Sequence, residues 1–116
     1  PRNLTQIMEM IATASSQGDS ALRVGLVFDG DSDRIGAIDG QGNFLSSQIL
    51  IPILINHLAT HKGMTGEVVK TVSGSDLIPL VAKSYNLALF ETAIGYKYIA
   101  DRMLTTPVLI GGEESG

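Results

Sequence analysis

The sequence contains no cysteine, which excludes disulfides, thiolate zinc sites, iron–sulfur clusters and a cysteine nucleophile. It also lacks any cluster of lysine and arginine, and its net charge is −4, which argues against a nucleic-acid surface or an anionic membrane surface as a partner. The longest apolar run, residues 49–55, is interrupted by Pro52 and is much shorter than the roughly 20 residues that span a membrane. We therefore expect small ligands as partners, and we expect a cytoplasmic location, with which the missing cysteines are compatible.

The length of 116 residues allows one compact domain, or one domain together with part of another. The chain begins with Pro1 instead of methionine, and it ends inside a glycine-rich run at residues 111–116. We therefore interpret the sequence as a piece of a longer protein.

Apolar periodicity and turn residues divide the chain into helices and strands. Helices are predicted at residues 3–17, 46–61, 77–86 and 94–104. Strands are predicted at residues 24–28, 35–38, 43–45, 67–72, 87–90 and 108–110, with a hairpin turn at 39–42. The continuous apolar segment 24–28 is typical of a strand buried on both faces, and Pro52 is expected near the first turn of its helix.

From residue 66 onward strands and helices alternate, which favours an α/β fold built as a three-layer α/β/α sheet with right-handed crossovers. Polar loops with glycine follow four of the predicted strands, at residues 29–34, 73–76, 91–95 and 111–116. Because ligands of such sheets bind beyond the carboxyl ends of the strands, we expect the ligand-binding or catalytic residues to lie in these loops.

The first of these loops, DGDSDR at residues 29–34, is the most informative segment of the sequence. Its three aspartates, Asp29, Asp31 and Asp33, occupy alternate positions, so their side chains share one side of an extended loop. Adjacent carboxylates repel each other, and a bound cation reverses that cost. Oxygen ligands without histidine or cysteine favour Mg²⁺, Mn²⁺ or Ca²⁺, and few protein ligands favour Mg²⁺. A solvated acidic turn is the alternative.

Two other acidic motifs can be compared with this loop by counting. An EF-hand loop that starts at Asp29 requires glycine at its sixth position and glutamate at its twelfth, where this sequence has Arg34 and Gly40, so that motif is excluded. A haloacid-dehalogenase-type phosphotransferase also places Asp-x-Asp after a strand, but this resemblance requires threonine or valine where Asp33 stands.

Two further loops carry candidate residues. The segment GGEESG at residues 111–116 offers Glu113 and Ser115, which alternate and are able to hydrogen-bond vicinal hydroxyls of a sugar. Lys97, near the start of a predicted helix, is able to contact phosphate or move a proton, whereas the alternative is a surface ammonium paired with Asp101.

Taken together, three segments resemble the α-D-phosphohexomutase superfamily, the phosphoglucomutase and phosphomannomutase enzymes. Residues 27–34 resemble the family's metal-binding loop, which is usually Asp-Gly-Asp-x-Asp-Arg. Residues 112–116 resemble its sugar-recognition loop, and residues 92–97 resemble a further active-site segment. The order and spacing of all three agree with the family.

The resemblance implies a four-domain enzyme that moves a phosphoryl group between the 1- and 6-hydroxyls of a hexose, through a bisphosphorylated sugar and a phosphoserine outside this sequence. Residues 1–39 would be the end of domain II with the metal-binding loop, and residues 40–116 would be most of domain III, a three-layer mixed sheet. A hexose phosphate and the remaining domains of the parent enzyme are the implied partners.

The resemblance also implies roles for individual residues. Asp29, Asp31 and Asp33 would hold Mg²⁺ as the cofactor. Arg34 would position phosphate and Lys97 would transfer a proton or contact phosphate, while Glu113 and Ser115 would hold sugar hydroxyls. The Glu-x-Ser pattern inclines toward glucose or mannose phosphates.

Two other hypotheses stay open from the sequence alone. One is a non-catalytic module that binds a divalent cation or a sugar phosphate. The other is a dehalogenase-like phosphatase that forms an aspartyl-phosphate on Asp29.

Overall fold

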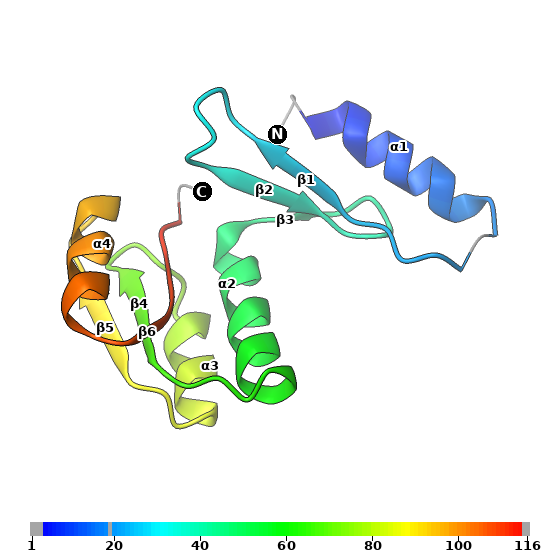
Figure 1. Ribbon diagram of the computed structural model, residues 1–116. Helices are drawn as coiled ribbons and strands as arrows, with labels where there is room; N and C mark the ends of the chain where they lie inside the picture. The colour runs from blue at the N-terminus through cyan, green and yellow to red at the C-terminus, as the bar shows by residue number, and fades with distance from the viewer. Residues whose placement is uncertain (1–3, 19, 115–116) are drawn as a thin grey trace. The chain divides into compact units, whose positions relative to one another are not determined.

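The computed structural model describes residues 4–18 and 20–114 (Figure 1). Its first elements are α1 (Thr5–Ser16), β1 (Gly25–Phe28), β2 (Ile35–Ile38), β3 (Phe44–Leu45), α2 (Ser47–Asn56) and a π-helical turn (His57–His61). They are followed by β4 (Glu67–Thr71), α3 (Leu77–Ser84), β5 (Leu89–Thr92), α4 (Tyr96–Thr105) and β6 (Val108–Gly112). Within the described ranges, none of the helices combines the length and the apolar character needed to cross a membrane.

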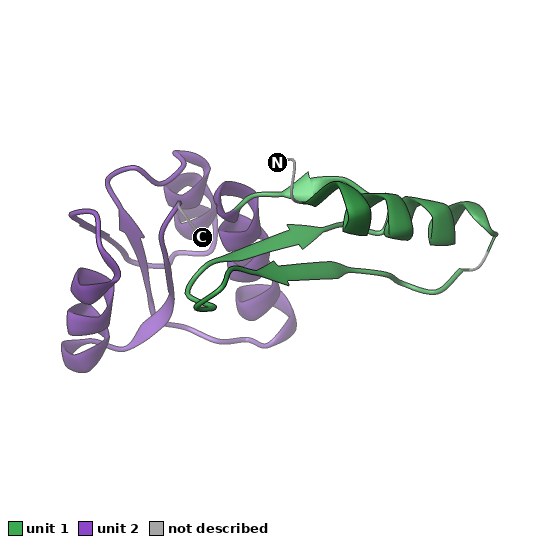
Figure 2. Ribbon diagram, turned by 90° about the horizontal axis from the view of Figure 1, so that it is seen from above, with its two compact units in different colours: residues 1–46, 116 green, residues 47–115 purple. Residues whose placement is uncertain are grey.

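The chain divides into two compact units, one within residues 1–46 and one within residues 47–115 (Figure 2). The first unit extends beyond residue 39, where the sequence placed a domain boundary, because β3 pairs with β2 on the far side of the hairpin turn. The hairpin itself is confirmed, since Asp39 N–H bonds the Asn43 carbonyl at 2.9 Å. Gly42 allows the turn through its φ of 89°, a region that side chains rarely adopt.

The first unit is an antiparallel sheet in the order β1-β2-β3, with α1 packed on one face. Its core consists of Leu4, Ile11 and Ile38. Gly25 allows α1 to approach closely, because a Cβ there would lie 2.7 Å from Ile11 Cδ1. The unit is therefore held together on the side of the sheet that faces α1.

The expectation that residues 24–28 are buried on both faces is wrong. Leu26 and Phe28 are 52% and 54% exposed, whereas Gly25 is buried and Val27 packs against the core. In an antiparallel sheet the side chains alternate between two faces, and α1 covers only the face of Gly25 and Val27. A continuous apolar run does not reveal which faces are covered.

The second unit is a parallel sheet in the order β5-β4-β6 between two helical layers, as the sequence predicted. α2 and α3 cover one face, where Ile51, Ile55, Ile78 and Ala82 pack around Val68 of β4. α4 covers the other face through Ile99. Two neighbouring glycines of β6 allow the helices on both faces to pack closely against the sheet. A Cβ on Gly111 would lie 2.6 Å from Ile99 of α4, and a Cβ on Gly112 would lie 2.5 Å from Ile51 of α2.

Several details differ from the predicted elements, among them a proline position and a strand start. Pro52 lies inside α2 and is buried, not in its first turn. β5 begins at Leu89 instead of residue 87, because the N–H of Leu87 still bonds the Ala82 carbonyl at the end of α3, at 2.9 Å. Asn86 makes this helix end possible with a left-handed φ of 54°.

Candidate functional site

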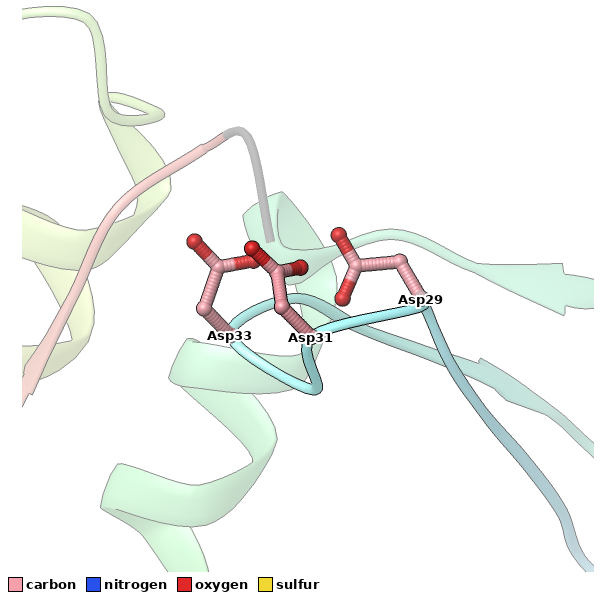
Figure 3. A group of neighbouring side chains, drawn as sticks. All are labelled: Asp29, Asp31 and Asp33. Carbon is pink, nitrogen blue, oxygen red and sulfur yellow. The ribbon is translucent and has the colours of Figure 1, made fainter.

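In the first unit, the loop between β1 and β2 carries the three aspartates predicted to bind metal. The Asp29 carbonyl accepts a hydrogen bond from Ser32 N–H at 3.1 Å, and Ser32 adopts a left-handed φ of 61°. This tight turn brings Asp29, Asp31 and Asp33 together, and one carboxylate oxygen of each lies within 4.8 Å of the others. Figure 3 shows the three carboxylates rising from the same side of the loop.

Arg34 closes the loop against these aspartates. Its backbone N–H bonds Asp29 Oδ1 at 3.2 Å, and its Nε lies 3.3 Å from Asp29 Oδ2 and 3.7 Å from Asp33 Oδ1. The guanidinium therefore offsets part of the negative charge, although its side chain remains 61% exposed.

The carboxyl groups titrate differently because their neighbours differ. Desolvation raises the pKa of Asp33, and the negative charges of Asp31 and Asp29 raise it further. Desolvation also acts upward on Asp29, but the hydrogen bonds from the Arg34 N–H and from Asp33, together with the guanidinium charge, leave its pKa below the ordinary value. The negative charges of the carboxylates repel one another, so the cluster favours any added positive charge.

The donor set suits a hard divalent cation. All three side chains offer carboxylate oxygens, and all three are exposed to solvent, which leaves room for water or phosphate oxygens as further ligands. With one oxygen from each aspartate and no nitrogen or sulfur donor among them, the set matches Mg²⁺ better than zinc or copper.

In the second unit, the carboxyl ends of β4, β5 and β6 lie at one edge of the sheet because the strands are parallel. Glu113, directly after β6, is only 5% exposed, and its Oε1 accepts a hydrogen bond from Gly95 N–H at 2.8 Å. Gly95 precedes α4 with a φ of 133°, which favours glycine. Glu113 thus ties the loop after β5 to the end of β6.

The next residue is tethered to α2. Ser47 donates its hydroxyl to the Glu114 carbonyl at 2.7 Å, and Gln48 Nε2 donates to Glu114 Oε2 at 2.8 Å. The loop predicted to recognise sugar is therefore anchored at Glu113 and Glu114, and Ser115 lies outside the described residues.

Lys97 lies in the first turn of α4 and is exposed. Its Nζ is 4.8 Å from the centre of the Tyr98 ring, a distance at which an ammonium is attracted to the aromatic face. Among the ion pairs of the described residues, none joins Lys97 to Asp101.

The structure adds one charged residue that the sequence analysis missed. Lys70 lies near the carboxyl end of β4 and is only 2% exposed, and its Nζ is 3.0 Å from Glu91 Oε2. The sequence could have indicated this residue, because Lys70 directly follows the apolar pair after Glu67 in a predicted strand, and buried lysines are rare without a partner or a function.

Residues 46–116 match the family described as phosphoglucomutase/phosphomannomutase, alpha/beta/alpha domain III. The chain belongs to this family. The match coincides with the second unit, whereas the acidic loop lies before it.

The phosphohexomutase relatives agree with this assignment. A phosphoglucosamine mutase of Acetivibrio thermocellus is 32% identical over 99 residues, covering 84% of this chain and 22% of the relative. One from Methanocaldococcus jannaschii is 30% identical over 115 residues, 99% of this chain and 25% of the relative, so this similarity includes the acidic loop.

The fold of this phosphohexomutase chain also matches solved structures. A structure described as a putative phosphomannomutase of Thermus thermophilus aligns with a TM-score of 0.83 and 25% identity, over 100% of this chain and 25% of that one. Parafusin, a phosphoglucomutase from Paramecium, aligns with a TM-score of 0.68 and 29% identity over 79% of this chain and 16% of that one. The chain thus spans about a quarter or less of the length of these relatives. Membership of the family leaves the dehalogenase-type phosphatase without support.

Proposed function

We propose that this chain is the part of a phosphohexomutase that carries a metal-binding loop and a sugar-recognition loop. The complete protein would interconvert hexose 1-phosphate and hexose 6-phosphate through a bisphosphorylated sugar and an enzyme phosphoserine. The observation that carries the proposal is the convergence of the Asp29, Asp31 and Asp33 carboxylates within 4.8 Å in a chain of this family.

The acidic loop supplies the electrostatic part of the reaction. Asp29, Asp31 and Asp33 would hold Mg²⁺, which when bound neutralises negative charge that develops on a transferred phosphoryl group. Arg34 already contacts two of these aspartates, and its exposed guanidinium is available to a phosphate oxygen as well. The loop thus combines carboxylates for the cation with a fixed cation for the phosphate.

The loops of the second unit supply recognition. Glu113 and Ser115 would hold sugar hydroxyls, and one oxygen of Glu113 remains for that role while the other binds Gly95 N–H. Lys97 would contact phosphate or transfer a proton, and its exposure at the start of α4 leaves it accessible. Lys70, held at the carboxyl end of β4, would be a second ammonium for a phosphate group.

For the substrate, we propose a glucose or mannose phosphate, because the recognition loop reads Glu-x-Ser at residues 113–115. The relatives named phosphoglucosamine mutases make glucosamine 1-phosphate the competing substrate. Turnover of the complete protein with glucose, mannose and glucosamine 1-phosphates would rank them. A preference for the glucosamine ester would overturn the choice of sugar but not the reaction.

The reaction itself is tested by converting glucose 1-phosphate to glucose 6-phosphate with the complete protein, supplied with Mg²⁺ and a trace of the bisphosphate. We expect turnover by the complete protein and none by the 116-residue chain alone, because phosphoryl transfer needs the serine and the loops of the other domains. Binding of Mg²⁺ and hexose phosphate without turnover by the complete protein would instead indicate a non-catalytic binding module.

A further inference from the structure

The two partners in the Lys70–Glu91 ion pair differ sharply in burial. The side chain of Lys70 is 3% exposed, whereas the side chain of Glu91 is 50% exposed, although Nζ and Oε2 lie only 3.0 Å apart. A buried ammonium depends on its partner, because an isolated buried charge is costly. For a half-exposed carboxylate, breaking the ion pair costs little free energy, because water hydrates the released carboxylate.

Lys70 has more hydrogen-bonding capacity than this contact uses. A lysine ammonium carries three donors. Among the described residues, Glu91 Oε2 is its one recorded acceptor. The two other carboxylates described at this edge of the sheet each use one oxygen for a different group: Glu113 binds Gly95 N–H and Glu114 binds Gln48. Within the described part of the chain, the remaining donors of Lys70 therefore have no recorded acceptor, although the side chain is only 3% exposed.

The backbone fixes where this ammonium is placed. In the sheet, Lys70 is the register partner of Glu91 on one side and of Gly112 on the other, and Gly112 directly precedes Glu113. The loop after β4 packs on the lysine stem, since a Cβ on Gly74 would lie 3.0 Å from Lys70 Cε. The ammonium is thus held beside the start of the sugar-recognition loop.

We propose that Glu91 is an exchangeable counter-ion: it neutralises Lys70 in the empty site and yields the ammonium to a phosphate group of the substrate. Glu91 then acts as a positioning residue that keeps Lys70 in place and competes with the anion. The inference rests on the proposed function for the identity of that anion. It predicts that removing the Glu91 charge strengthens phosphate binding, whereas a purely supporting role predicts that it weakens binding.

The test is Glu91→Gln in the complete protein, with affinity for inorganic phosphate and for glucose 1-phosphate measured by calorimetry at one ionic strength. The amide keeps the size of the side chain but removes the competing charge. We expect the dissociation constant of both ligands to fall about threefold to fivefold, the gain given by removing one partly exposed charged competitor. KM should fall similarly, with a smaller change in kcat.

Three comparisons make the result specific. Glu9→Gln removes a charge from an exposed position of α1 and should leave both affinities unchanged. In a Lys70→Met background, Glu91→Gln should have no effect on phosphate affinity, because the coupled partner is gone. Glu91→Asp keeps the charge but withdraws it by one methylene, and it should give a smaller gain, which provides a second variant if the glutamine protein folds poorly.

Weaker or unchanged phosphate binding by folded Glu91→Gln protein would overturn the proposal, as would an equal gain in the Lys70→Met background. The affinity for inorganic phosphate does not depend on turnover. A gain in that affinity without mutase activity would therefore support the counter-ion role of Glu91 and reject the proposed function. Mutase activity without the gain would support the proposed function and reject the counter-ion role.

Discussion

The acidic loop of the first unit and the loops at the sheet edge of the second unit are built in opposite ways. The acidic loop gathers Asp29, Asp31, Asp33 and Arg34 from six consecutive residues, and their side chains are largely in solvent. The second unit uses buried residues far apart in the sequence: Lys70 pairs with the Glu91 carboxylate, and Glu113 accepts a hydrogen bond from the Gly95 N–H. Substitutions in a local, exposed site are expected to change ligand binding without affecting stability. Substitutions in a buried site held by hydrogen bonds are expected to change both ligand binding and stability.

The largest effect is expected from Asp31→Asn in the complete protein. Losing one of three carboxylates should weaken Mg²⁺ binding and lower kcat by about a hundredfold to a thousandfold, since a catalytic metal stabilises the transition state by several kcal/mol. Asp31 is exposed, so the midpoint of denaturant unfolding should stay the same. Steady-state kinetics and unfolding of the same preparation check both statements, and normal turnover at equal folded fraction would contradict the metal assignment.

The next effect concerns stability in the second unit. Gly66→Ala should destabilise the protein by about 3 kcal/mol or more, because a Cβ there would lie 2.7 Å from the Leu109 backbone nitrogen. Its φ of +145° is a further strain for any side chain.

Gly30→Ala in the acidic loop is the matched control, since a Cβ at Gly30 meets nothing within 4 Å. Denaturant unfolding should separate the two variants clearly. Equal unfolding free energies for the two variants would contradict the claim that Gly66 is packed tightly and Gly30 is not.

A smaller effect is expected when the tether of the second unit is cut. Glu113→Ala leaves Gly95 N–H without its acceptor and should cost about 1–3 kcal/mol of unfolding free energy. Glu113→Gln keeps an acceptor oxygen, so it should retain most of that stability while weakening sugar binding. If both variants unfold like the wild type, the hydrogen bond at 2.8 Å does not hold the loop.

The smallest effect is a pH dependence away from both sites. Two hydrogen bonds from Arg102, at 2.7 and 2.9 Å, lower the pKa of Glu67. Desolvation raises this pKa, and the positive charge of the guanidinium lowers it further. Because the folded pKa lies below the ordinary 4.5, the pair stabilises the fold above that pH and loses its contribution as the pH falls through the folded value.

Glu67→Gln should therefore lower the unfolding midpoint at neutral pH and flatten its decline below pH 4.5. Thermal unfolding across this range measures the difference. A parallel decline in both proteins would show that the pair makes no pH-dependent contribution.

The sequence predicted most of the elements and the grouping of the three aspartates, because both depend on neighbouring residues. Helical spacing located α1 and α4 to within a few residues, and the alternation after residue 66 predicted the three-layer sheet. Asp29, Asp31 and Asp33 do meet, but through a tight turn with Ser32 at a φ of 61° and not along the extended loop that the sequence predicted. The roles assigned to these residues, and to Arg34, remain predictions.

What the sequence could not provide depends on packing between distant segments. The exposure of Leu26 and Phe28 follows from which face α1 covers, and this is not encoded in an apolar run. Lys70 was overlooked because a lysine in a strand is usually exposed, and its burial results from the loop at Gly74 and the neighbouring strands. The Glu113–Gly95 hydrogen bond joins residues that only the parallel sheet brings together.

The strand order β5-β4-β6 has a practical consequence for handling the protein. Within the described residues, both outer strands pair only with β4, so each presents one row of backbone amides and carbonyls without a strand beside it. Such rows are templates for strand addition. Preparations of the 116 residues by themselves should therefore self-associate as their concentration rises, and dilution or a solubilising fusion is the natural precaution.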